Sequence, residues 1–425
     1  MVFQRATVRR HPDVIVQALN VKDVQEAVRY AAHNGIKVTT RCGGHSYSSS
    51  FLREDGMLID VSHLDGIEVD KDTKTAIVDP GVFGRRLNQR LAEEGLAFPT
   101  AHAGIVPLSG FLLGGGVGLN GRAWAPGGIS TFAVTAVDIV TADGQLRHAS
   151  RTENPDLFWA VRGGGPGLFG VVVKFHLQCF DAPGTIWTVN YMFPSGELDT
   201  VIETMVRLAP QLEKNVKIGL GMTPAPAHAR DRIHLSVYAF TADEKDGRRL
   251  VAPVSNDPII TRALEHTPGR EISIDDYYAA DDDYADTYRN PHMMDTIWTE
   301  DPHAAFQILK KHIAENPSSG SYLSLHYLGS DPLPDSAFSK KASYYIGYTQ
   351  EWSHPEQEAA CRDYSVKVFN ELKPLAHGSY INEMDQIGRA SDIPDSYSPD
   401  AWARLSTLRQ QWDPKNVFHD FYGRE

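Results

Sequence analysis

The sequence predicts an α+β fold with two domains, because the chain is long and its residue pattern changes near residue 180. The chain has 425 residues, whereas single cores usually stop growing at about 250–300 residues. Before residue 180, short strands alternate with amphipathic helices and glycine-dense loops; after it, glycine is sparse and aromatic-rich strands alternate with helices. We expect domains over 1–180 and 181–385, with 386–425 returning to the first domain.

Composition excludes several classes of protein. The chain is 42% hydrophobic and 22% charged, with a net charge of −13, and shows neither low complexity nor internal repeats. Nucleic-acid binding depends on Lys and Arg clusters, which are not evident here, so we expect no nucleic-acid partner. Apolar runs such as 168–173 are far shorter than the ~20 residues of a membrane span.

The chain start and the cysteines bear on the cellular compartment. Residues 1–5 have no apolar core followed by a small-residue cleavage site, so no secretory signal is visible. We expect a soluble protein and leave a cytoplasmic or a secreted location open. The three cysteines, Cys42, Cys179 and Cys361, are too few and too scattered for a disulfide framework or a metal knuckle.

In the first domain, apolar residues at helical spacing predict a helix over 20–34, with Asn20 as its N-cap and Gly35 at its end. A second amphipathic helix is predicted over 83–94, ended by Gly95. A short helix is expected at 157–161. Alternating apolar residues predict strands at 36–40, 57–61, 67–69, 75–78, 132–140 and 171–177, with a hairpin turn at 142–144.

In the second domain, the aromatic-rich strands predict an antiparallel sheet flanked by helices, because runs that are apolar on both faces are scarce. Strands are expected at 187–193, 232–240 and 343–348. Helices are expected at 198–212, 303–313 and 355–372, with a final helix at 401–411 in the returning segment.

The segment 41–47 is the most informative motif, because a glycine turn follows a strand and is followed by His45. Backbone N–H groups in a turn with Gly43 and Gly44 are able to point together at phosphate oxygens, and glycine lets a ligand approach closely. His45 then lies beside whatever the phosphates carry. The alternative is an ordinary tight loop with a surface histidine.

A second glycine-dense stretch covers residues 104–128 and contains the pattern GxGxxG at 116–121. In a dinucleotide-binding Rossmann unit this pattern opens a helix. Residues 122–128, Arg-Ala-Trp-Ala-Pro-Gly-Gly, are unable to extend one. The context therefore argues against a Rossmann unit, and the chain has no GxxxxGK[ST] phosphate loop.

Four motifs in this order match one known family: RCGGHS at 41–46, LGGGVG at 113–118, NPDLFWAVRGGG at 154–165 and DPKNVF at 413–418. On these residues the chain resembles the FAD-linked oxidases with a PCMH-type FAD-binding domain, in the berberine-bridge-enzyme-like branch. The resemblance extends over nearly the whole chain. Between about residue 181 and residue 370 it lies in layout and not in motifs.

The resemblance implies that FAD is bound covalently through the ring of His45. It also implies that the surrounding backbone holds the pyrophosphate, that the glycine run lies flat against the cofactor, that Val172 is near the adenine and that Asn416 is near the isoalloxazine ring. The residues expected to bind FAD are Arg41, Cys42, Gly43, Gly44, His45, Ser46, Tyr47, Val106, Gly110, Gly114, Gly115, Gly116, Gly118, Trp124, Val172 and Asn416.

Two further positions follow from the resemblance. Many relatives have a second covalent link from a cysteine, and counting back from Gly114 places Ala103 there, so we expect no cysteinyl link. The same counting places Val106 where the side chain governs oxygen access to the reduced flavin. Valine at that position fits an oxidase.

For catalysis, relatives often use the second tyrosine of a Y-x-N-Y segment as the base, and here that segment is Tyr380-Ile381-Asn382-Glu383. A glutamate serves as a base when burial raises its pKa toward neutrality. We therefore predict Glu383 as the base and Tyr380 as a supporting donor, with a solvated glutamate as the alternative. Asp335 is a further acidic candidate, for which a plain surface loop is the favoured alternative.

Several aromatic residues and histidines are suggestive by position alone: Tyr345, Tyr348, His102, His326 and Trp124. An aromatic stripe or a packed histidine is an equally good interpretation of each. No residue is predicted to bind a metal.

The function implied by the resemblance is a flavoprotein oxidase that takes a hydride from an alcohol, an amine or a secondary metabolite, with O₂ reoxidising the cofactor to give H₂O₂. Two alternatives remain open: a flavin-dependent cyclase or tailoring enzyme of natural-product biosynthesis, and a flavin-binding protein without turnover. The expected partners are a small-molecule substrate and O₂, without nucleic acid or membrane. The sequence does not decide the oligomeric state.

Overall fold

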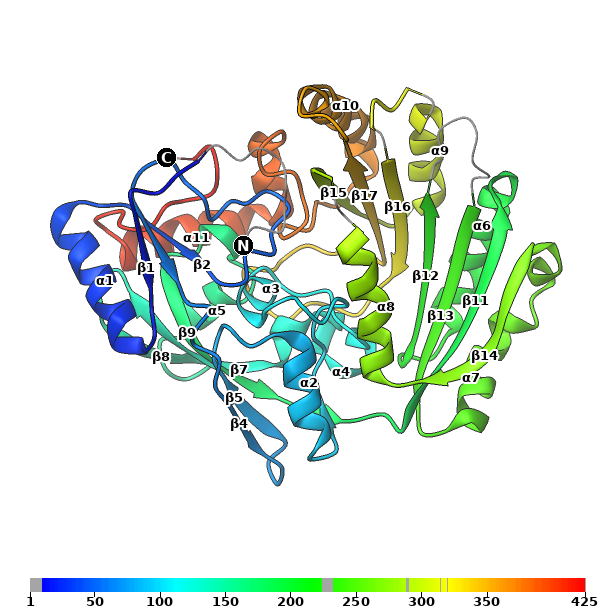
Figure 1. The fold of residues 1–425 in the computed structure, drawn as a ribbon, viewed down its shortest axis with the longest axis horizontal. Helices are drawn as coiled ribbons and strands as arrows, with labels where there is room; N and C mark the ends of the chain where they lie inside the picture. Colours follow the sequence, from blue (N-terminus) through cyan, green and yellow to red (C-terminus); the bar gives the residue numbers. More distant parts are fainter. Residues whose placement is uncertain (1–9, 224–231, 288–289, 314, 319, 425) are drawn as a thin grey trace.

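The computed structural model describes residues 10–223, 232–287, 290–313, 315–318 and 320–424, and its elements form two lobes side by side (Figure 1). The strands are β1 Val14–Gln17, β2 Val38–Arg41, β3 Met57–Asp60, β4 Ile67–Asp70, β5 Thr75–Val78, β6 Leu96–Ala97, β7 Val134–Thr141, β8 Leu146–Ser150, β9 Gly170–Gln178, β10 Phe180–Asp181, β11 Thr185–Pro194, β12 Val216–Thr223, β13 Arg232–Thr241, β14 Glu265–Ile272, β15 His292–Thr299, β16 Gly320–Tyr327 and β17 Tyr344–Glu351. The α-helices are α1 Val21–Asn34, α2 Gly84–Ala92, α3 Leu108–Leu113, α4 Gly121–Trp124, α5 Pro155–Val161, α6 Leu198–Leu208, α7 Glu244–Ser255, α8 Ile274–Thr287, α9 Pro302–Ile313, α10 Gln357–Leu372 and α11 Pro399–Trp412.

The first lobe contains two main sheets. Strands β1, β3 and β2 pair in parallel in that order, and the antiparallel sheet has the order β4-β5-β9-β7-β8. Helix α1 begins with a capping box in which Asn20 and Asp23 bond each other's backbone, and Gly35 ends it with φ 67°. Its buried alanines and valines pack on Val140 and Val171, so α1 joins the two sheets.

The second lobe is built on a seven-stranded antiparallel sheet with the order β14-β11-β13-β12-β16-β17-β15. Helices α6, α7, α9 and α10 cover one face, where their apolar residues share a core with alternate residues of the strands. Along β12, for example, Ile218 and Met222 enter this core, whereas Lys217, Gly219 and Gly221 face the first lobe. One face of the sheet is therefore left for a ligand.

Helix α8 crosses from the sheet to the first lobe (Figure 1). The buried Tyr278 hydroxyl accepts a hydrogen bond from Asn88 Nδ2 at 2.6 Å and also bonds Thr100 Oγ1. Because Asn88 belongs to α2, this contact fastens α8 onto the first lobe.

The C-terminal segment returns to the first lobe. Helix α11 buries Leu405 and Leu408 in the core that contains the five-stranded sheet, together with Phe421. Past the helix, Phe418 bridges Val38 in parallel, and His419 N–H donates to the Val38 carbonyl at 3.0 Å. The last residues of the chain therefore lie beside β2, the strand that precedes the glycine turn.

The α+β fold and the antiparallel second sheet are confirmed, and most expected elements are present with shifted ends. Strand 75–78 is found as predicted, while the helix expected over 198–212 ends at Leu208 because a 3₁₀ turn with Pro210 follows. The elements that were not predicted are β1, β6, β8, β10, β12, β14, β15, β16, α3, α4, α7 and α8.

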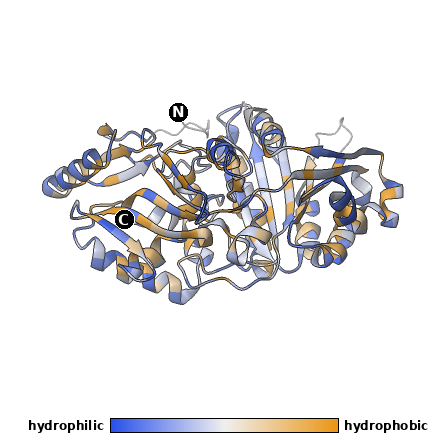
Figure 2. Ribbon diagram, turned by 90° about the horizontal axis from the view of Figure 1, so that it is seen from below, coloured by the Kyte–Doolittle hydropathy of each residue, from blue (hydrophilic) through white to orange (hydrophobic). Residues whose placement is uncertain are grey.

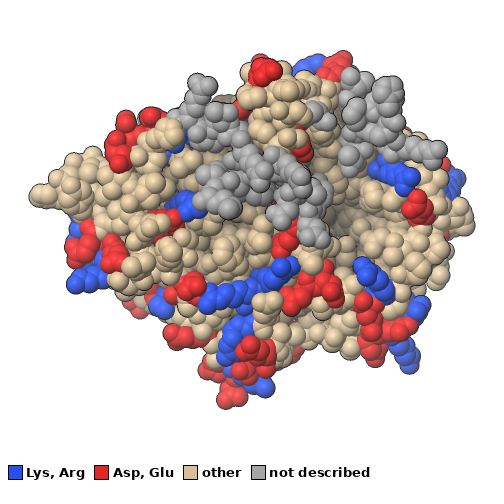
Figure 3. Space-filling model, in the orientation of Figure 1, with Lys and Arg blue, Asp and Glu red and all other residues tan. Residues whose placement is uncertain are grey.

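The surface and the core show the expected distribution of residue types. Strands of the five-stranded sheet are mostly hydrophobic, and the helices carry a hydrophilic side (Figure 2). On the face shown in Figure 3, acidic and basic side chains are intermixed. No helix in the described ranges combines the length and the apolar character that crossing a membrane requires.

Candidate active site

A cavity of about 800 Å³ lies between the two lobes. This volume is within the roughly 300–1,000 Å³ of typical ligand pockets. One wall comes from the first lobe: the turn after β2, α3 with the loop before it, and the start of β9. The opposite wall comes from β12, β13, β16 and β17, and from the loop at residues 380–386.

All seven residues of the glycine turn, 41–47, line this cavity. Arg41 at the end of β2 is held by an ion pair with the buried Asp60, and the Cys42 thiol donates to the Pro80 carbonyl at 3.3 Å. Gly44 has φ 71°, a conformation that glycine adopts without strain. A side chain at Gly43 would bring a Cβ within 2.8 Å of Pro107. The turn therefore needs its glycines to follow this path.

His45 sits on this turn in an environment that keeps its imidazole neutral. Burial, with a smaller contribution from the charge of His292, lowers the pKa of His45 to about 4. A neutral imidazole retains a nitrogen lone pair at physiological pH. The side chain is therefore in the form that is able to make a covalent bond through nitrogen.

Glu383 lines the same cavity from the opposite side. Burial raises the pKa of its carboxyl to about 7, although a hydrogen bond donated by the Tyr345 hydroxyl to Oε2 acts in the opposite direction. Such a carboxyl exchanges a proton near neutral pH. Glu383 is thus partly buried and bonded to Tyr345, which favours the role of a base over that of a solvated glutamate.

Tyr380 also lines the cavity, and its hydroxyl is fixed by three donors. It accepts hydrogen bonds from Gly116 N–H at 3.0 Å, Val117 N–H at 3.3 Å and Asn382 Nδ2 at 3.0 Å. Burial raises the pKa of this phenol, so it stays protonated. With three bonds accepted, the hydroxyl proton is left to donate.

The glycine run is placed differently from the prediction, since Gly114, Gly115, Gly116 and Gly118 do not line the cavity. They instead allow protein segments to approach closely. A Cβ on Gly114 would lie 1.9 Å from Asn382 Oδ1, and one on Gly118 would lie 2.4 Å from the Pro99 carbonyl oxygen. The glycines at 114–118 therefore let the loop that carries Tyr380 and Glu383 pack closely against this segment.

Three other predicted residues lie outside the cavity. Asp335 is on the surface, 84% exposed, where it accepts from Trp159 Nε1 at 2.8 Å and pairs with Arg404. Trp124 stacks against Phe180, so it belongs to packing.

Asn416 is in an exposed turn with φ 53°, and its carbonyl accepts from Lys37 Nζ. The neighbouring Phe418 and His419 are the residues of this segment that reach the cavity. The left-handed turn at Asn416 directs the chain back to β2, so Asn416 itself lies outside the cavity and the predicted cofactor contact would come from its neighbours.

The remaining predicted cofactor positions, Val106, Gly110 and Val172, all line the cavity. A Cβ built on Gly110 meets no atom within 4 Å, so the space above this glycine belongs to the cavity.

At one end of the cavity, His102 from the first lobe meets His326 and Lys217 from the sheet of the second lobe; the two histidines were suggestive by position, whereas Lys217 was not predicted. His102 and His326 stack with ring centroids 6.4 Å apart, and burial lowers the pKa of both, to about 3 for His326. Gly219 makes room for this pair, because a Cβ there would lie 2.6 Å from His326 Nδ1. Lys217 donates to the Tyr277 hydroxyl at 2.7 Å at the same end of the cavity. Gly219, a glycine inside a strand, is the sequence feature that could have indicated a close approach of side chains at this end of the cavity.

Known proteins match the whole chain. Residues 12–150 match the family of FAD binding domains. FAD-linked oxidoreductase nodO of Hypoxylon pulicicidum is 26% identical over 98% of this chain and 92% of that protein. (R)-6-hydroxynicotine oxidase of Paenarthrobacter nicotinovorans is 25% identical over 97% of this chain and 91% of that protein. The solved structure of Physcomitrella patens BBE-like 1 superposes with a TM-score of 0.85 at 21% identity, covering 99% of this chain and 92% of that one.

Residues 12–150 belong to the family of FAD binding domains, and this FAD-dependent oxidoreductase is similar over nearly its whole length to FAD-linked oxidoreductases. The cavity of this oxidoreductase fits the cofactor on its own residues: a glycine turn follows a strand at one wall, and open space extends above Gly110. Histidine, carboxyl and phenol groups converge on the same volume. The cavity between the lobes is therefore the candidate site of this FAD-dependent enzyme.

Proposed function

We propose that this enzyme oxidises an alcohol, an amine or a secondary metabolite by hydride removal and reduces O₂ to H₂O₂. One observation carries the proposal: a carboxyl group with a pKa near 7, Glu383, shares a cavity with the glycine turn that holds His45. Catalytic acids and bases are often carboxyl groups that lie beside a cofactor site and have a shifted pKa.

The turn at 41–47 and the ring of His45 are proposed to hold the cofactor. Bound FAD supplies the acceptor for the hydride. The neutral His45 ring, with its pKa lowered to about 4, supports a covalent bond through nitrogen. Ala103 at the cavity wall offers no thiol, so we propose this histidine as the sole covalent attachment.

Glu383 is proposed as the base that removes the proton from the substrate O–H or N–H. In its ionised form the carboxylate accepts that proton, while the Tyr345 hydroxyl holds Oε2 in place. Tyr380, whose oxygen is fixed by backbone N–H groups, is left to donate its proton to the substrate. The two groups would orient the substrate heteroatom between an acceptor and a donor.

The use of O₂ is supported by Val106, whose short side chain lines the first-lobe wall of the cavity. A small apolar residue leaves space for O₂ beside the cofactor and offers it no competing hydrogen bond. The proposed use of O₂ does not depend on which residue acts as the base.

The test is anaerobic mixing of the purified holoenzyme with a panel of alcohols and amines while the visible absorbance of the flavin is followed. Substrates that bleach the wild-type absorbance should bleach a Glu383→Gln variant about 10²–10⁴-fold more slowly, because the amide accepts no proton at neutral pH. Glu153→Gln, at an exposed glutamate, is the matched control and should behave as wild type.

A different experimental result would contradict each part of the proposal. Equal bleaching rates in Glu383→Gln and wild type would exclude the base role. Colour that does not return on admission of air would exclude the oxidase. Turnover of a substrate while the absorbance remains fully oxidised would favour the cyclase alternative.

A further inference from the structure

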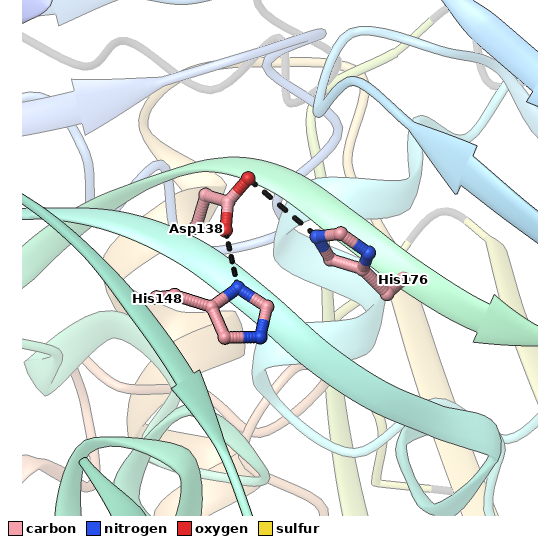
Figure 4. A group of neighbouring side chains, drawn as sticks. All are labelled: Asp138, His148 and His176. Carbon is pink, nitrogen blue, oxygen red and sulfur yellow. Dashed lines mark hydrogen bonds and ion pairs between the residues drawn. The ribbon is translucent and has the colours of Figure 1, made fainter. Parts of the chain in front are cut away.

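Three side chains of the five-stranded sheet, none of which lines the cavity, gather at one place: Asp138 on β7, His148 on β8 and His176 on β9 (Figure 4). Asp138 and His148 are direct register partners, and His176 is the partner of Ala136. Residues paired across strands or two apart on one strand share a face of the sheet. The three side chains therefore project from three adjacent strands onto one face.

Both imidazole rings point at the carboxylate (Figure 4). His148 Nδ1 is 2.7 Å from Asp138 Oδ1, and His176 Nε2 is 3.5 Å from Oδ2. His176 Nε2 is buried and makes no hydrogen bond with any described residue. The ring planes are nearly perpendicular, at 88°, with centroids 5.2 Å apart. The carboxylate therefore receives one hydrogen bond and faces a second, unsatisfied ring nitrogen.

The spacing matches the requirements of a divalent transition metal. The three possible ligand atoms lie within 4.8 Å of one another. With metal–ligand distances of about 2.0–2.2 Å, neighbouring ligands in a tetrahedral zinc site are about 3.4 Å apart. The separations of 2.7 Å and 3.5 Å lie on either side of that value, so small side-chain rotations bring the three atoms to bonding distance.

The surroundings leave one side of the cluster open. The side chains of His148, His176 and Asp138 are 38%, 25% and 22% exposed, so a solvent molecule is able to reach a fourth position. The nearest cation on this face is Lys174, the register partner of Asp138, and it is paired with Asp79 at 3.2 Å. The ion pair with Asp79 therefore partly offsets the positive charge of Lys174.

We propose that Asp138, His148 and His176 form a binding site for Zn²⁺ or a similar borderline divalent cation. Two neutral imidazoles and one carboxylate, with a fourth position open to water, are a ligand set that zinc accepts, whereas Mg²⁺ and Ca²⁺ prefer oxygen ligands. On binding, the ring proton of His148 moves from Nδ1 to Nε2 by exchange with solvent, so that a neutral imidazole presents the Nδ1 lone pair to the cation. Because the ligands stand on three hydrogen-bonded strands, the ion joins β8, β7 and β9.

The test is a calorimetric titration of EDTA-treated, dialysed holoenzyme with ZnCl₂. Wild type should bind one zinc ion at this site. The variants His148→Ala, His176→Ala and Asp138→Asn should each weaken the binding by at least about 100-fold, because removing a ligand costs more than the 10–100-fold of an outer-shell change. Asp138→Asn nearly preserves the shape of the side chain. His354→Ala, which removes an exposed histidine elsewhere, is the matched control.

A second readout uses cobalt. Co²⁺ bound by nitrogen and oxygen ligands gives visible d–d absorption at longer wavelengths than oxidised flavin, and this absorption should be present in wild type and His354→Ala and absent in Asp138→Asn. Flavin content and circular dichroism of each variant establish that it is folded. Failure of wild type to bind zinc, or equal binding by all the variants, would overturn the proposal.

Discussion

At the scale of single residues, the pair Tyr345 and Glu383 determines the pH range in which the site works. Burial raises the pKa of Glu383 to about 7, and the hydrogen bond from Tyr345 acts against that rise, so the pKa is set by a balance between these two effects. If Glu383 is the base, activity is low when the carboxyl is protonated. It rises as the pH increases through the pKa.

Replacing Tyr345 by phenylalanine removes a donor to the charged carboxylate. The pKa of Glu383 should then rise by about 1 unit, the equivalent of one hydrogen bond to a charged group, and the acidic limb of kcat/KM should move to higher pH. The measurement is a pH–rate profile of both proteins. Tyr344→Phe is the control, since the Tyr344 hydroxyl contacts the Val206 carbonyl instead. An acidic limb that stays in place or moves to lower pH would contradict this interpretation.

The proposed covalent role of His45 gives a second prediction at this scale. When wild type is precipitated with acid, flavin should remain on the polypeptide, whereas in His45→Ala it should appear in the supernatant. His419→Ala is a matched control, because His419 lines the same cavity and burial also lowers its pKa to about 4. Peptide mass spectrometry of the wild-type pellet locates the adduct. Flavin retained by His45→Ala would exclude the proposed bond.

At the scale of elements, two glycines around helix α3 have opposite surroundings. A Cβ at Gly114 would overlap Asn382 in the loop that carries Tyr380 and Glu383, whereas a Cβ at Gly110 meets open space. Gly114→Ala should lower the free energy of unfolding by about 1–3 kcal/mol and displace the loop. Chemical denaturation measures the free energy, and the rate of substrate-dependent bleaching reports the loop.

Gly110→Ala is the companion variant. Alanine is favoured over glycine inside a helix by up to about 1 kcal/mol, so the free energy of unfolding should not fall. The added methyl group enters the cavity, and the flavin content should decrease instead. Loss of stability in Gly110→Ala equal to that in Gly114→Ala would show that the two glycines do not differ as described.

Elements with strong local patterns could be predicted from the sequence, and elements defined by pairing could not. The capped helix α1 and the turn at 41–47 were found because their signals are local. Strand β12 contains Gly219 and Gly221, which weaken the strand pattern but leave room for His326 and Tyr322 from the neighbouring strand. Likewise, the cluster of Asp138, His148 and His176 arises only when three strands pair.

The residues of the candidate site divide in the same way, into those with a local sequence signal and those brought together only by folding. The residues on the first-lobe wall were predicted because the motif at 41–47 is contiguous, and Glu383 was predicted from its neighbours along the chain. Asp335 lies on the surface, in agreement with the favoured alternative of a plain surface loop and not with a catalytic role. The polar wall of His102, His326 and Lys217 depends on contacts between lobes.

At the scale of the whole molecule, a buried ion pair connects the second-lobe sheet to the returning C-terminal segment. Arg389 Nη1 is 2.7 Å from Asp295 Oδ1 on β15, and the two side chains are 7% and 0% exposed. Burial raises the pKa of Asp295 to about 6, with Arg389 acting against that rise. Further along the same segment, Ile393 and Tyr397 pack into the core of the first lobe. The pair therefore anchors the strand nearest the site to the chain that closes the fold.

Removing one partner should cost more than removing both. Arg389→Met leaves the Asp295 carboxylate buried without its cation, which typically costs about 3–5 kcal/mol, and the double variant Arg389→Met/Asp295→Asn should recover part of this loss. Without Arg389 the folded-state pKa of Asp295 rises further above its unfolded value, so protonation stabilises the variant at low pH. Its deficit in the free energy of unfolding should therefore be smaller at pH 5 than at pH 8. Urea denaturation of the three proteins at both pH values measures this, and a deficit that grows toward pH 5 would show that Asp295 does not carry the uncompensated charge.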